Sequence, residues 1–253
     1  MLRKFSNSRT VKDNIQLGSL SAFSAGMVNV TSVIIFFAFT SNVTGHYAIF
    51  AEEVAKGNWN GAVIVFAWIF LFFIGNFCSN QVIINFNHKN SYLAHSLPLF
   101  LEIICLFAVG TYGEFYYQET LLETEIMVGL MLFAMGLQNG LTASISNFSV
   151  KTTHMTGLTT DVGILASMYT KKKYRNNKQL KEKGKVLLSI ALAYITGGIF
   201  AGVIYLKIQF MVFYVACFAI FIIIGYEYYK LKINKLIRRR RKQPISAKYK
   251  IAD

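Results

Sequence analysis

The sequence has 253 residues, of which 54% are hydrophobic and 15% charged, and its formal net charge is +14. A soluble domain has about 25% charged residues, so this composition excludes an ordinary soluble enzyme and leaves no room for a separate soluble catalytic domain. The apolar residues come in blocks of about 20, the length that crosses a ~30 Å hydrocarbon layer as a helix. The sequence therefore predicts an all-α, polytopic membrane protein.

The basic residues lie between the apolar blocks and not on a soluble face. We therefore expect anionic lipid head groups, not nucleic acid, as their partners, at about 1 kcal/mol for each residue near the membrane surface. The three cysteines lie inside apolar blocks, and none has a CxxC neighbour. We expect no disulfide, no metal site and no cofactor.

The chain begins with a basic segment, residues 1–16. No small-x-small cleavage site follows the next apolar run, so we expect an uncleaved first span and not a signal peptide. Residues 17–112 form a first membrane repeat, with spans expected at residues 18–39, 61–84 and 92–112, the last two joined by a polar loop at residues 85–91.

An acidic loop, residues 113–125, separates this repeat from a second one at residues 126–229. The second repeat contains a basic loop at residues 171–185 and is followed by a basic tail at residues 230–253. Its spans are expected at residues 126–145, 186–206 and 208–229.

Positive charge marks the cytoplasmic side of a membrane protein. With six spans and both termini in the cytoplasm, 24 of the 26 Lys and Arg residues lie inside, and the acidic loop lies outside. Only Lys56 and Lys207 then lie outside. This is the topology that we predict.

A short motif occurs twice along the chain. The first copy is Gly-x-x-Asn at residues 26–29 followed by Asn-Val-Thr-Gly-His at residues 42–46, and the second is Gly-x-x-Asn at residues 136–139 followed by His-Met-Thr-Gly at residues 154–157. Each half has three spans, and an odd number means that the second half enters the membrane from the opposite side. We therefore expect two inverted-topology three-helix repeats, the arrangement of many secondary transporters.

Each copy of the motif places a polar Thr-Gly break after the first helix of its half. Broken helices persist in lipid only where they face protein or a cavity, so the two breaks point to a central site. The alternative is a pair of ordinary turns at the membrane surface, capped by Asn42 and Thr153. The depth of the breaks decides between these interpretations.

The candidate solute path consists of the motif residues and of nearby ionisable side chains. Asn29 and Asn139 either hydrogen-bond between helices or line the path. The proposed path residues are Asn29, Asn42, Thr44, Gly45, His46, Glu102, Asn139, His154, Thr156, Gly157 and Asp161.

Two histidine–carboxylate pairs and one glutamate have two interpretations each. On helical segments, His46 would share a face with Glu53, and His154 with Asp161, so each pair is either a proton relay or two separately satisfied side chains. Glu102 lies inside the third expected span, where an ionised carboxylate costs about 2.5–3.5 kcal/mol at the bilayer centre. It is either functional or structurally paired.

The Gly-x-x-Asn span, the Thr-Gly break and their recurrence before a basic loop resemble the YoaK-like family of bacterial membrane proteins. The resemblance covers residues 17–229 and implies a six-span fold and a bacterial plasma-membrane location. That family tends to have Met-Thr-Gly-Asn at both breaks, whereas here Val43 replaces the first Met, and His46 and Leu158 follow the glycines. The family has no established biochemical activity, so the resemblance implies no mechanism.

The leading hypothesis is a small-solute transporter or permease with its site between the two halves. The alternative is a non-transporting membrane scaffold or regulatory protein whose basic loop and tail bind lipid or protein. The chain contains no HExxH, GxSxG or P-loop sequence, so we assign no catalytic residue and do not expect an enzyme.

Overall fold

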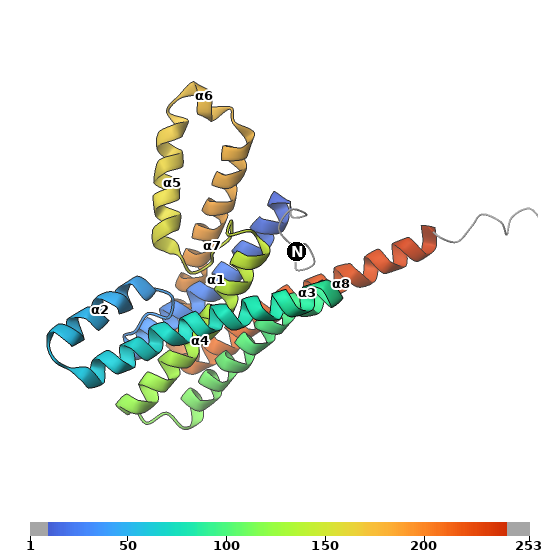
Figure 1. The fold of residues 1–253 in the computed structure, drawn as a ribbon. Coiled ribbons are helices and arrows are strands. Elements are labelled where there is room, and N and C mark those ends of the chain that lie inside the picture. Colours follow the sequence, from blue (N-terminus) through green and yellow to red (C-terminus); the bar gives the residue numbers. More distant parts are fainter. Residues whose placement is uncertain (1–9, 242–253) are drawn as a thin grey trace, which may run out of the picture.

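The computed structural model describes residues 10–241, without the side chains of residues 227 and 230–241, and this part of the chain contains helices and no strand (Figure 1). The basic residues 1–9 and the end of the tail, residues 242–253, lie outside the described residues. The helices are α1 (Val11–Phe36), α2 (Val43–Ala55), α3 (Trp59–Phe115), α4 (Leu121–Ile145), α5 (Met155–Tyr169), α6 (Lys172–Arg175), α7 (Lys178–Ile208), the 3-10 turn η2 (Gln209–Met211) and α8 (Val212–Arg241).

Four helical stretches are long and apolar enough to cross a membrane, which indicates a helical membrane protein. Two of them far exceed the roughly 20 residues that one crossing needs. They are Trp59–Phe115, with 57 residues, and Lys178–Tyr226, with 49 residues and the turn η2 inside it. The other two are Val11–Phe36 and Leu121–Ile145.

The long helix α3 reverses direction at one residue, Asn90, whose φ of −155° and ψ of 95° are not helical (Figure 1). The Asn90 side chain caps the second segment, because its amide oxygen accepts hydrogen bonds from the backbone N–H groups of Tyr92, at 3.1 Å, and Leu93, at 3.2 Å. The predicted polar loop at residues 85–91 is therefore wrong. The two helical segments are separated by Asn90 alone, because its side chain caps the start of the second segment.

A row of phenylalanines lines the outer face of the first segment of α3. Phe66, Phe70, Phe73 and Phe77 stack one on the next, with ring centroids 6.1–6.4 Å apart. Each ring is about half exposed. Exposed apolar surface of this extent marks an interaction face, and hydrocarbon is the environment that suits it in a membrane protein.

The helices α1 and α7 pack closely because glycines line their interface. A Cβ atom added at Gly26 would overlap the carbonyl oxygen of Tyr194, and one added at Gly197 would overlap that of Phe23. Small residues of this kind let membrane helices approach backbone to backbone.

The helices α3 and α4 meet in the same way. A Cβ atom at Gly136 would overlap the carbonyl oxygen of Phe72, and one at Gly75 would overlap that of Phe133. The motif glycine of each half thus packs against a glycine-bearing helix of the other half.

Candidate functional site

A cavity of about 400 Å³ lies between the two Thr-Gly segments. Its lining residues come from α1, α4, the segments that precede α2 and α5, the first turns of those two helices, the first segment of α3 and the middle of α7. They are Asn29, Phe39, Ser41, Asn42, Val43, Thr44, Phe72, Asn139, Lys151, Thr153, His154, Met155, Thr156 and Tyr194.

The lining residues can be matched by sequence position, one from each half of the chain. The two motif copies pair Asn29 with Asn139 and Thr44 with Thr156, and the glycine contacts pair Phe72 with Tyr194. Counting outward from each Thr-Gly step gives the remaining pairs, Phe39 with Lys151, Ser41 with Thr153, Asn42 with His154 and Val43 with Met155. Every lining residue belongs to such a pair.

The cavity lies beside the middle of two long helices. Phe72 is near the centre of the first segment of α3, which runs from Trp59 to the bend at Asn90. Tyr194 is near the centre of α7, Lys178–Ile208. The cavity is therefore distant from both ends of these helices.

The helix α2 begins inside the predicted break and not after it. Asn42 is the N-cap, and its side-chain oxygen accepts a 3.2 Å hydrogen bond from the N–H of Gly45. Thr44, Gly45 and His46 therefore form the first turn of α2, and the non-helical residues are 37–42. Glycine suits this position because a Cβ atom at Gly45 would lie only 3.0 Å from the Asn42 amide nitrogen.

The helix α5 begins in the same way, with His154 at the N-cap and Thr156 and Gly157 in the first turn. A Cβ at Gly157 would overlap the His154 ring. The predicted cap Thr153 is wrong, because the chain turns into the helix one residue later, and His154 makes no side-chain cap hydrogen bond.

The first break is held in place by Asn29. Its amide oxygen accepts hydrogen bonds from the backbone N–H groups of Thr40, at 2.9 Å, and Ser41, at 3.1 Å. The Ser41 hydroxyl in turn contacts the Tyr194 hydroxyl at 2.9 Å. Asn29 thus holds the backbone of the first break and also lines the cavity.

Asn139 occupies the matching place but is bonded differently. Its amide nitrogen donates to the side-chain oxygen of Asn76 at 3.5 Å, and its own oxygen has no hydrogen-bond partner among the described residues. The Asn139 oxygen is therefore buried without a partner, whereas the oxygen of Asn29 accepts hydrogen bonds from two backbone N–H groups.

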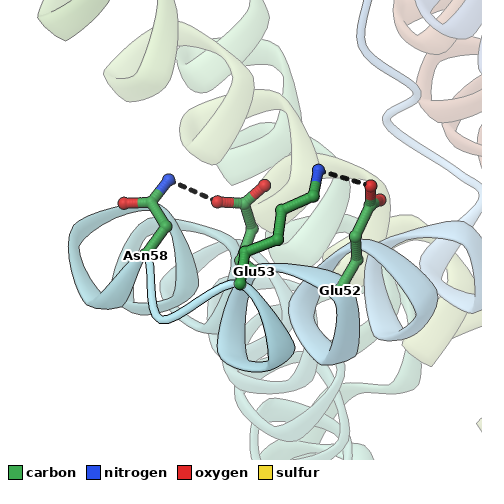
Figure 2. A network of polar contacts seen from close by, with 4 residues as sticks. Glu52, Glu53 and Asn58 are labelled. Atoms are coloured by element: carbon green, nitrogen blue, oxygen red, sulfur yellow. Dashed lines mark hydrogen bonds and ion pairs between the residues drawn. The ribbon is translucent and has the colours of Figure 1, made fainter.

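His46 does not line the cavity and does not pair with Glu53. Its ring nitrogen Nε2 lies 2.7 Å from the carbonyl oxygen of Phe39, and its ring packs edge-on against Trp68. Glu53 is at the other end of α2 and accepts a hydrogen bond from Asn58 (Figure 2). The proton-relay interpretation of this pair is wrong, because the two side chains turn toward different partners.

The far end of α2 carries a small ionic network beside Glu53. Lys56 lies 2.6 Å from the neighbouring carboxylate Glu52 (Figure 2). The hydrogen bond from Lys56, and then its charge, lower the pKa of Glu52. Charged groups therefore gather at the end of α2 that is remote from the cavity.

His154 and Asp161 share a second cavity, of about 260 Å³, which also contacts Lys151 and Gly157. No hydrogen bond joins the histidine to the carboxylate among the described residues. Asp161 instead forms a 3.1 Å ion pair with Lys183.

Glu102 is fully buried and lies apart from the first cavity. Neither of its oxygens has a hydrogen-bond partner among the described residues. The predicted structural pairing of Glu102 is therefore not seen among the described residues. Glu102 is also not one of the residues that line the first cavity.

The predicted path did not include eight of the lining residues: Phe39, Ser41, Val43, Phe72, Lys151, Thr153, Met155 and Tyr194. For Phe72 and Tyr194 a signal was present, because each lies three residues before a glycine of the close helix contacts, Gly75 or Gly197.

A family model described as "Protein of unknown function (DUF1275)" matches residues 17–226. Comparisons with curated proteins and with solved structures find no match. The matched stretch contains both breaks and every residue that lines the first cavity.

Proposed function

This chain belongs to the DUF1275 family, whose function is unknown, and we propose that it is a small-solute transporter or permease whose path includes the cavity between α2 and α5. One observation carries the proposal: every residue lining that cavity has a counterpart from the other half of the chain. In many secondary transporters the solute site lies at the interface of two such repeats, and access alternates as one repeat moves against the other.

The same pairing supports an inverted-topology repeat with six membrane crossings. The bend at Asn90 divides α3 into two crossings, and η2 separates α7 from α8. In this arrangement α1 and α2 correspond to α4 and α5, and the two segments of α3 correspond to α7 and α8. The reciprocal glycine contacts follow from such a twofold relation.

The lengths of α2 and α5 support a cavity near the middle of the membrane. They have 13 and 15 residues, so each is about 20 Å long, roughly half of a bilayer with its head groups. Each starts at the cavity and runs back to the beginning of the next long helix, α3 or α7 (Figure 1). In the inverted arrangement these half-helices reach opposite surfaces.

The charge distribution supports a cytoplasmic location for the turn between α5 and α7. Arg175, Lys181 and Lys185 line an apolar groove of about 500 Å³ between these helices. An apolar groove with cationic residues suits an anionic lipid, whose head group and acyl chain match the two parts. We propose such lipids as partners at this end, and labelling from one side of the membrane tests the orientation.

Flux into reconstituted vesicles tests the transport proposal. We expect wild-type protein to admit at least one of four probes, glycerol, rubidium, acetate or phosphate, faster than empty vesicles. Thr156→Val and Asn139→Ala should lower that flux about tenfold or more, because each removes a polar group that faces the solute.

Matched controls come from residues that do not line the cavity. Thr159→Val changes the same side chain one turn further along α5, and Asn85→Ala changes an exposed amide on α3. Both should retain wild-type flux. If no probe enters faster than into empty vesicles, the transport proposal fails and a non-transporting scaffold or regulatory protein is favoured. If the cavity variants transport like wild type, the site assignment is wrong.

A further inference from the structure

Two helix N-termini meet at the first cavity. Val43 and Thr44 begin α2, Met155 and Thr156 begin α5, and all four residues line the cavity. The first turn of a helix has backbone N–H groups without intrahelical partners, and the helix dipole places about half a positive charge there. The cavity thus receives partial positive charge from both halves.

A buried hydroxyl adds a second and independent polar feature. The Thr153 side chain lines the cavity although Thr153 is only 6% exposed, and it makes no hydrogen bond among the described residues. A buried hydroxyl without a partner is unfavourable unless a ligand or solvent bonds to it. Thr153 directly precedes the N-cap His154 and lines the same cavity as the two helix N-termini.

The side chains around the cavity have one sign of charge. Lys151 is the cation among the lining residues, and none of these residues is a carboxylate. The nearby carboxylate Asp161, which shares the second cavity with Lys151, is paired with Lys183 instead. Lys151 has no ion pair among the described residues, so its charge is available to a bound solute.

We propose that this cavity binds the anionic group of its solute, a carboxylate or a phosphate oxyanion of a small molecule. The inference rests on the proposed function, because it names the solute class of the same site. Helix N-termini supply N–H donors for the oxyanion, Lys151 supplies the full charge, and Thr153 donates its hydroxyl proton. The Asn139 side chain lines the same cavity and offers an amide to a hydroxyl-bearing part of the solute.

Thermal unfolding of the purified full chain in detergent tests binding without requiring transport. Sodium acetate and sodium phosphate are the two probes, and they distinguish a carboxylate solute from a phosphate solute. A ligand that binds only the folded state raises its stability by mass action, so at least one probe should raise the unfolding midpoint by about 2–4 °C. Lys151→Gln and Thr153→Val should each reduce the affinity for that probe about tenfold or more.

Two control variants separate binding at the cavity from a general salt effect. Lys89→Gln removes an exposed lysine on α3, and Thr152→Val removes a buried, unpartnered hydroxyl next to Thr153 that does not line the cavity. Both should keep the wild-type shift. The inference is overturned if neither anion shifts the midpoint, or if the shift persists unchanged in Lys151→Gln.

The outcome for binding is independent of the outcome for transport. Binding of an anion that is lost in Lys151→Gln, with no flux of any probe into vesicles, supports the anion site and rejects the transporter. Flux of glycerol or rubidium without binding of either anion supports the transporter and rejects the anion site.

Discussion

A single methyl group at Gly26 is expected to force α1 away from α7 and to destabilise the fold by about 1–3 kcal/mol or more. The physical reason is that the new Cβ would overlap the carbonyl oxygen of Tyr194, a backbone atom that no rotamer change can move. Gly136→Ala should have a comparable effect, since its Cβ would overlap the carbonyl oxygen of Phe72. The measurement is the thermal midpoint of each variant in detergent, followed by size-exclusion chromatography.

Gly163→Ala is the matched control for these substitutions. Gly163 lies in the interior of α5, and a Cβ there meets nothing within 4 Å. Alanine is a better helix former than glycine by about 1 kcal/mol, so this variant should match or exceed wild-type stability. Wild-type midpoints for both Gly26→Ala and Gly136→Ala would contradict the close helix contacts.

The substitution Asn29→Leu is expected to release the first break. It removes the acceptor for the Thr40 and Ser41 N–H groups and leaves both donors without their partner. An unsatisfied buried donor costs about 1–3 kcal/mol, so a large loss of stability should follow. Thermal unfolding and limited proteolysis within residues 37–42 measure the two consequences.

Asn139→Leu tests whether that loss is specific to Asn29. The two asparagines match in the sequence motif, but Asn139 makes one long hydrogen bond to a side chain and holds no backbone. Asn139→Leu should therefore keep a stable fold while it impairs transport. Equal destabilisation by the two substitutions would show that Asn29 has no special structural role.

The sequence predicted the all-helical membrane class and two related polar segments because both depend on local patterns. Apolar blocks of span length identify the helices, and the recurring Gly-x-x-Asn and Thr-Gly steps identify two related segments. These steps lie at helix starts, where Thr44 and Thr156 face one cavity. Local sequence patterns were therefore sufficient to predict the helical membrane class and the two related segments.

The errors arose where the surroundings of a side chain depend on how the chain folds and not on residue spacing alone. His46 and Glu53 share a helix face, yet the chain folds back so that the Phe39 carbonyl meets the histidine ring. A seven-residue spacing cannot reveal that contact. Glu102 looked like a path residue because it is a charge in an apolar span, but the burial of α3 against α8 decides its surroundings.

The central claim is that two half-helices start at one cavity and end on opposite sides of the membrane. Those two ends are marked by Lys56, just past the end of α2, and by Lys173, in the short helix α6 that follows α5. Each is replaced by cysteine in a chain whose three native cysteines are replaced by serine or alanine, and intact cells are treated with a membrane-impermeant maleimide.

In this experiment, Lys56→Cys should react in intact cells, whereas Lys173→Cys should react only after the cells are lysed. Labelling of both positions from the same side would contradict the inverted arrangement, and with it a cavity shared by two oppositely inserted halves.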